Sequence, residues 1–159
     1  MKLQTAQGLQ IGNLHPEVVT VAGDLFANGH YAPAIFEAVK ALEQRVRKQS
    51  HLDESGWDLM AKAFGGEHPA IDLSVESGQS GRNEQLGLRF VFMGLFQGVR
   101  NPKAHERVEQ EDPQRTLEYL GMVSLLFRRL DDAVGKAEPR SECKKRRVLR
   151  AGNKRRVVN

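Results

Sequence analysis

Cysteine is almost absent from this 159-residue chain, and long apolar runs are missing. With Cys143 alone, no disulfide can form within the chain, which is typical of proteins from a reducing compartment. The longest apolar stretch, Phe90 to Phe96, is interrupted by Gly94 and falls far short of the roughly 20 residues that span a bilayer. Residues 1–8 contain one lysine and no apolar block, unlike a secretory signal. We therefore expect a soluble, cytoplasmic protein with no membrane partner.

Several kinds of chemical site also find little support in the residue pattern. The five histidines are scattered along the chain, and no Cys/His pair has the spacing of zinc ligands. The run from Gly78 to Arg82 contains Ser80 but lacks the second glycine of a nucleophile elbow. A phosphate-binding glycine loop is missing as well. The sequence therefore predicts neither a metal site nor a bound cofactor.

The net charge of +4 is distributed unevenly. Residues 135–159 contain ten Lys or Arg and two Glu, a net charge of +8, which leaves −4 for the rest. This composition predicts one domain over residues 1–134, followed by a basic and flexible tail over residues 135–159. The tail cluster Lys144, Lys145, Arg146 and Arg147 could bind nucleic acid through its phosphates. A solubilising disordered end is the alternative.

Apolar residues at helical spacing predict an all-α fold. The expected helices start at Pro16 and end at Asn28-Gly29, run from Tyr31 to about Ser50, continue from Ser55 to Phe64, and then cover residues 83–99 and 114–134. Asp112-Pro113 is a favourable N-cap and first-turn pair for the last of these. Residues 67–82 could form a short strand, but a loop is favoured. We expect a compact antiparallel bundle of four or five helices.

Two expectations about packing follow from the same spacing. The helix over residues 83–99 should bury Leu86, Phe90, Met93 and either Leu95 or Phe96 along one face. Tyr31 and Trp57 are expected to be partly buried packing residues, in preference to platforms for stacking nucleic-acid bases.

The segment from Arg100 to His105 lies between the last two expected helices and is the best candidate for a catalytic site. Pro102 cannot donate a backbone hydrogen bond and disfavours the α conformation at Asn101, so the helix should kink or end there. Arg100 and His105 can then project into shared space. An imidazole with a pKa of about 6.5 can exchange protons with a ribose hydroxyl, and a guanidinium can hold the phosphate. This pair suits metal-independent phosphodiester cleavage.

The same residues resemble a known superfamily. Arg100, four residues and His105, with polar Asn101 after the arginine, are similar to the R-x4-6-H motif of HEPN domains, which are compact helical bundles. The stretch from Leu14 to Leu130 is similar to a group of uncharacterised bacterial and phage proteins of Ymh type in that superfamily. The segments that carry this likeness are Leu14-His15-Pro16, residues 29–43 and residues 96–105.

The resemblance implies a homodimeric ribonuclease that cleaves RNA through its own 2′-hydroxyl, often as a toxin or an effector of phage defence. Arg100 and His105 match the catalytic pair, and Asn101 matches the polar residue that supports it. Glu37 or Glu43 in the second helix could orient the arginine. Lys103 is expected to contact the nucleic acid. A cognate antitoxin or another defence protein is a possible partner.

Other functions are also compatible with these residues. The first hypothesis is an endoribonuclease, and the second is a non-catalytic RNA-binding or adaptor module of a defence or toxin–antitoxin system. A third is a phage structural or regulatory protein whose bundle only dimerises. His105 could merely cap a turn, Arg100 could stabilise a helix C-terminus, and Glu37 and Glu43 could be surface ion pairs.

Overall fold

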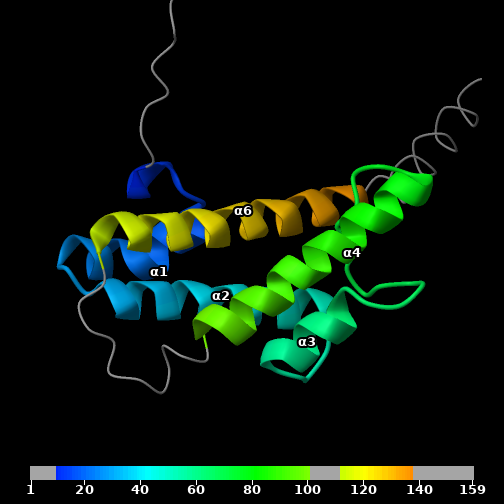
Figure 1. The fold of residues 1–159 in the computed structure, drawn as a ribbon, viewed down its shortest axis with the longest axis horizontal. Helices are drawn as coiled ribbons and strands as arrows, with labels where there is room; N and C mark the ends of the chain where they lie inside the picture. Colours follow the sequence, from blue (N-terminus) through cyan, green and yellow to red (C-terminus); the bar gives the residue numbers. More distant parts are fainter. Residues whose placement is uncertain (1–9, 101–111, 138–159) are drawn as a thin grey trace, which may run out of the picture.

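A computed structural model describes residues 10–100 and 112–137 of the chain (Figure 1). Its elements are η1 (Ile11–Asn13), α1 (Pro16–Ala27), α2 (Tyr31–Ser50), α3 (Gly56–Ala63), α4 (Gly78–Leu95), η2 (Phe96–Arg100) and α6 (Pro113–Ala137). Over these ranges all regular structure is helical, which confirms the predicted all-α bundle. None of the helices described is long and apolar enough to cross a membrane.

Helix α2 is the central element of the bundle. It packs against α1, α6 and α3, and it also contacts η2 at the end of α4. Figure 1 shows α2 and α6 side by side, with α4 crossing them obliquely. This position explains why α2 has one broad apolar face, on which Ala34, Ile35, Ala38, Val39, Leu42 and Val46 are all fully buried.

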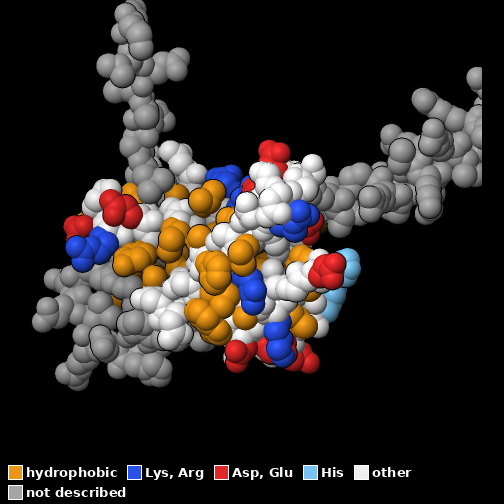
Figure 2. Space-filling view, turned by 45° about the vertical axis from the view of Figure 1, so that its right-hand side comes forward, with side chains coloured by type: hydrophobic (Ala, Val, Ile, Leu, Met, Phe, Trp, Pro, Cys, Tyr) orange, Lys and Arg blue, Asp and Glu red, His pale blue; other side chains and the backbone are white. Residues whose placement is uncertain are grey.

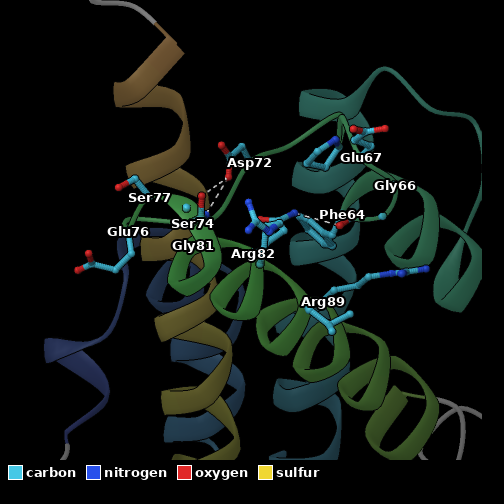
Figure 3. A pocket seen from close by; sticks show the side chains of 15 residues that line it. Phe64, Gly66, Glu67, Asp72, Ser74, Glu76, Ser77, Gly81, Arg82 and Arg89 are labelled. Atoms are coloured by element: carbon cyan, nitrogen blue, oxygen red, sulfur yellow. Dashed lines mark hydrogen bonds between the residues drawn. The ribbon is translucent and has the colours of Figure 1, made fainter.

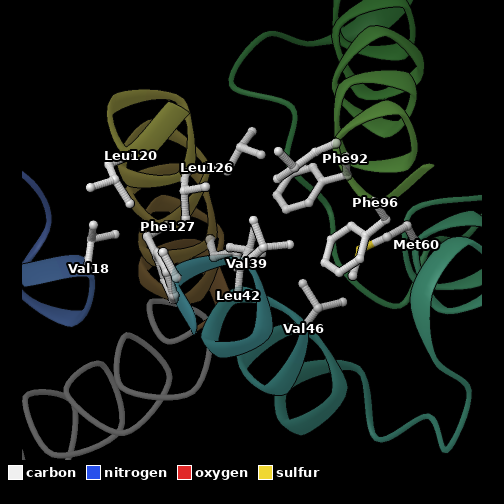
Figure 4. Packing of buried hydrophobic residues seen from close by; sticks show 14 of the residues in the cluster. Val18, Val39, Leu42, Val46, Met60, Phe92, Phe96, Leu120, Leu126 and Phe127 are labelled. Carbon is white, nitrogen blue, oxygen red and sulfur yellow. The ribbon is translucent and has the colours of Figure 1, made fainter. Parts of the chain in front are cut away.

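The hydrophobic core is continuous from α1 to the end of α4. Figure 4 shows Val39, Leu42 and Val46 of α2 between the apolar side chains of α6 on one side and Phe92, Phe96 and Met60 on the other. The rings of Phe64 and Phe92 lie 4.4 Å apart, a distance typical of aromatic packing. Burial of these side chains fixes α4 and η2 against α2 and α3.

The predicted ends of α1, α2 and α6 are close to the observed ones. Pro16 stands in the first turn of α1, and Gly29 follows its end with φ of 76°, a left-handed conformation that glycine adopts without strain. The Asp112 carboxylate accepts a hydrogen bond from the Arg115 N–H at 2.9 Å, which confirms it as the N-cap of α6. Helix α6 continues to Ala137, three residues beyond the predicted end.

His15 joins the start of α1 to α6. Its Nδ1 accepts a hydrogen bond from the Glu17 N–H at 3.2 Å, so the ring proton belongs on Nε2, which donates to Asp131 at 2.9 Å. The ring stacks on Phe127 at 4.9 Å, and the backbone N–H of His15 donates to the Ser124 hydroxyl. His15 belongs to the Leu14-His15-Pro16 segment, which carries part of the likeness to Ymh-type proteins. Because it is buried and hydrogen-bonded to both α1 and α6, its role is structural.

Helix α4 begins at Gly78, five residues before the predicted start at residue 83. The glycines at positions 78 and 81 argue against a helix on propensity alone. Tertiary packing overrides this preference, because a Cβ at Gly81 would lie 2.3 Å from the Glu76 carbonyl oxygen. Only glycine lets the first turn of α4 pack this closely on the preceding loop.

The predicted buried face of α4 is partly wrong. Met93, Leu95 and Phe96 are buried, but Leu86 is 48% exposed and Phe90 is 57% exposed. Phe92 occupies the core position that the spacing had assigned to Phe90. The reason is that α4 packs into the bundle through the face that carries Phe92 and Leu95, whereas Leu86 and Phe90 share the opposite face. Trp57, expected to be partly buried, is also exposed at 43%, whereas Tyr31 packs edge-on against Phe26 as expected.

The connection between α3 and α4 is a loop, as predicted, and two side chains of α4 hold it. Gln85 accepts a hydrogen bond from the Leu73 N–H and donates to the carbonyls of Phe64 and Ile71. The N–H groups of Val75 and Glu76 donate to the Glu84 carboxylate and lower its pKa, and Arg129 adds to this effect. Ionised Glu84 therefore stabilises the loop at neutral pH, and this contribution is lost as the pH falls through the lowered pKa.

Candidate functional site

The backbone changes from α-helical to π-helical geometry at the end of α4, just before the Arg100–His105 segment. The α-helical pattern ends at Leu95, and the chain continues as the π-helical turn Phe96–Arg100. Such turns are rare and are often found at functional sites, because they re-aim the side chains that follow. The predicted end or kink at Asn101-Pro102 lies outside the described residues and stays a prediction.

Glu43, one of the two acidic residues that the sequence suggested as partners of Arg100, is buried. It lies on α2, which contacts η2, and only 4% of its surface is exposed. Its Oε1 accepts a hydrogen bond from the Gly56 N–H at 2.7 Å and one from Arg47 at 3.2 Å. A carboxylate at the N-terminus of α3 is favourable, because the helix dipole is positive there.

This arrangement corrects one prediction about α3. Ser55 stands at the N-cap position, but its side chain makes no capping hydrogen bond. Glu43 supplies the acceptor instead, from a residue 13 positions earlier in the chain. Gly56 has φ of 56°, so its glycine identity permits the left-handed conformation that presents its N–H to the carboxylate.

Glu37, the other acidic candidate, has a different environment. Its side chain is 40% exposed and forms an ion pair with Lys40 at 3.2 Å. Such surface pairs contribute little to stability. Of the two acids that could orient Arg100, Glu43 is the one held rigidly inside the bundle.

The remaining predicted site residues lie outside the described part of the chain. These are Asn101, Lys103 and His105 in residues 101–111, and Lys144, Lys145, Arg146 and Arg147 in residues 138–159. The backbone of Arg100 is described, but its side chain is not. The pairing of Arg100 with His105 therefore stays a prediction from the sequence.

A cavity near the start of α4 was not predicted at all. It has a volume of about 580 Å³ and lies between α4, the loop after α3 and the end of α3 (Figure 3). Arg82 and Arg89 line it, together with Ser74 and Ser77. No short motif joins these residues, and only the spacing of two arginines seven apart on one helix could have suggested a shared face.

Metal ligands do not gather in the described residues, where no group of three or more His, Cys, Asp or Glu side chains could hold an ion. His15, the buried histidine of this part of the chain, is engaged by Asp131 and Glu17 as a structural residue.

The fold and these residues define an all-α helical-bundle protein with a π-helical turn that ends at Arg100, directly before Asn101-Pro102. Residues 12–130 match the family model Hypoth_Ymh, described as a protein of unknown function, and the chain belongs to this family. The match confirms the Ymh part of the resemblance and includes residues 100–105. Neither the curated proteins nor the solved structures contain a match to this chain.

Proposed function

We propose that this protein is a metal-independent endoribonuclease of HEPN type. The observation that carries the proposal is the π-helical turn that ends at Arg100, directly before Asn101-Pro102 and five residues before His105, in a chain that belongs to the Ymh family. A helix end with this irregular geometry suits residues that must project together toward a substrate.

In the proposed reaction, His105 moves protons and Arg100 holds the scissile phosphate. The imidazole removes the proton from the ribose 2′-hydroxyl or donates one to the leaving 5′-oxygen. The 2′-oxygen attacks the phosphorus, the bond to the 5′-oxygen breaks, and a 2′,3′-cyclic phosphate is left. The guanidinium stabilises the charge that develops on the phosphate, and Asn101 and Lys103 help to bind the strand.

Glu43 fits the role of a positioning residue for Arg100. It is buried in α2, and α2 packs against η2, where the backbone of Arg100 lies. Glu37 fits less well, because its exposed carboxylate pairs with Lys40. The biological setting we propose is a toxin or phage-defence effector, with a cognate antitoxin or another defence protein as its partner.

Incubation of the purified protein with end-labelled single-stranded RNA should give cleavage in the presence of a chelator. The products should carry 2′,3′-cyclic phosphate ends, because the nucleophile is the neighbouring 2′-hydroxyl. DNA of the same sequence should stay intact, since it lacks that group. Cleavage that requires added Mg²⁺ would contradict the mechanism, and RNA binding without cleavage would favour the adaptor function.

We further propose that two copies of the chain associate through α4. Leu86, Phe90 and Val91 are 48%, 57% and 43% exposed on this helix. Gly87 and Gly94 lie among them, with no atom within 4 Å of an added Cβ. Figure 2 shows hydrophobic side chains gathered across the middle of one face of the molecule. A second copy is the expected occupant, because a two-fold axis beside α4 would bring both Arg100 segments together.

Phe90→Asp should convert the dimer into a monomer and abolish cleavage, because the proposed cleft is formed by the Arg100–His105 segments of both subunits. The side chain is exposed, so helicity should not change. Light scattering at micromolar concentration measures the mass, and circular dichroism checks the fold. Val134→Asp, on α6 and 39% exposed, is the matched control and should remain dimeric. A strictly monomeric wild type with intact cleavage would contradict this interface.

A further inference from the structure

The cavity beside the first half of α4 faces two arginines that the proposed cleavage does not use. Arg82 and Arg89 both line it, and their separation of seven residues places them on the same side of α4. Two helical turns separate their backbones by about 10 Å. Figure 3 shows the Arg89 side chain extending away from Arg82, so these long side chains must rotate to reach one group between them. The volume of about 580 Å³ falls within the range of small-molecule sites, roughly 300–1,000 Å³.

Arg89 has no hydrogen-bond or ion-pair partner among the residues that the structure describes, and its Nε is buried. Gly65 lies directly against its guanidinium, because a Cβ at that position would be 3.0 Å from Cζ of Arg89. A buried donor without an acceptor is costly, and such groups call for a ligand or another explanation. An anion in the cavity would give this guanidinium group an acceptor at its terminal nitrogen atoms.

Arg82 has a neutral partner only. Its Nη2 donates to the Gln79 side chain at 2.8 Å, and no carboxylate pairs with it in the described part of the chain. The N-terminus of α4 begins four residues earlier, and Ser77 there makes no side-chain capping hydrogen bond. The partial positive charge of this helix end adds to that of the two guanidinium groups.

Acidic residues line the same cavity, but their placement leaves the arginines available. Asp72 accepts hydrogen bonds from the backbone and hydroxyl of Ser74 at 3.0 and 2.6 Å. Glu67 and Glu76 are exposed, and Figure 3 shows Glu76 pointing away from Arg82. Both exposed carboxylates are therefore in contact with water, which weakens their effect on the cavity.

We propose that this cavity is a binding site for the phosphate group of a nucleotide, held by Arg82 and Arg89. A guanidinium binds phosphate through two parallel hydrogen bonds, which a lysine cannot offer. The phosphate can come from a free mononucleotide or from the backbone of an RNA strand. This site is separate from the Arg100 segment at the other end of α4, and its existence does not depend on RNA cleavage.

Calorimetric titration of the full chain with inorganic phosphate and with AMP, at constant ionic strength, tests the site. The wild type should bind both, and Arg82→Gln/Arg89→Gln should raise the dissociation constant by about 100-fold, roughly tenfold for each guanidinium contact that is lost. Lys40→Gln/Lys48→Gln removes the same charge from exposed positions of α2 and should bind like the wild type. Arg82 is exposed, so Arg82→Gln alone serves if the double variant fails to fold.

Competition identifies the source of the phosphate. A short single-stranded RNA that displaces AMP from the wild type would show that an RNA strand enters the site, whereas AMP binding without displacement would assign it to a free nucleotide. Both outcomes support the phosphate site. It is overturned if the wild type binds neither inorganic phosphate nor AMP, or if the arginine variants bind them as tightly as the wild type.

Discussion

Replacing His105 with alanine should reduce RNA cleavage by about 10²- to 10⁴-fold, the usual contribution of a positioned general acid or base. Stability and most of the RNA affinity should be unchanged, because we expect a residue that follows Pro102 to lie in a turn and to contribute little to the core. The assay compares end-labelled RNA in chelator, with helicity checked by circular dichroism and affinity by fluorescence anisotropy.

Arg100→Ala is the informative companion to this variant. It should weaken both binding and cleavage, because the guanidinium would hold the phosphate before and during the reaction. His105→Ala should therefore lose RNA cleavage but keep RNA binding, whereas Arg100→Ala should lose both. If a folded His105→Ala protein still cleaves RNA at the wild-type rate, the imidazole is not the proton-transfer group and the segment is a structural turn.

Replacing Glu43 with alanine should lower the free energy of unfolding by about 2 to 3 kcal/mol, since hydrogen bonds to buried charged groups are worth roughly 1.5 to 3 kcal/mol. The Gly56 N–H at the start of α3 would lose its acceptor, and Arg47 would lose its ion-pair partner. Urea denaturation followed by circular dichroism measures the change. If the variant is as stable as the wild type, the Glu43 carboxylate does not stabilise the start of α3.

Glu37→Ala is the matched control on the same helix, and Glu43→Gln separates two roles of one residue. Glu37 is exposed, so its loss should change stability by less than about 0.5 kcal/mol. Glutamine at position 43 keeps an oxygen for the Gly56 N–H and should preserve most of the stability. A marked fall in cleavage by this folded variant, with RNA binding retained, would show that the charge of Glu43 positions Arg100.

Much of the bundle could be predicted from residue order, because the features that decide it are local. The spacing of apolar residues predicted α2, Pro16 predicted the start of α1, and Asp112 predicted the start of α6. Prediction was weaker where two segments far apart in sequence meet. The first turn of α4 depends on the contact of Gly81 with the Glu76 carbonyl, and the choice of its buried face depends on which side of the helix packs on the bundle.

The candidate site divides in the same way. Arg100 and His105 could be selected because they are close in sequence and form a short motif with a chemical meaning. Glu43 could be suggested but not separated from Glu37, since burial and the contact with Gly56 appear only in three dimensions. The cavity at Arg82 and Arg89 could not be predicted, because its wall is a loop whose path depends on hydrogen bonds to Glu84 and Gln85.

The sequence by itself determined the helical class, the position of most helix ends and the Ymh family, because helix periodicity and capping act over a few neighbouring residues and the family pattern lies in the order of residues. Tertiary structure alone decided that Glu43 caps α3, that His15 ties α1 to α6, and that Phe92 is buried while Phe90 is exposed. The physical reason is that burial and hydrogen-bond partners depend on how separate helices pack, and local residue spacing does not specify that packing.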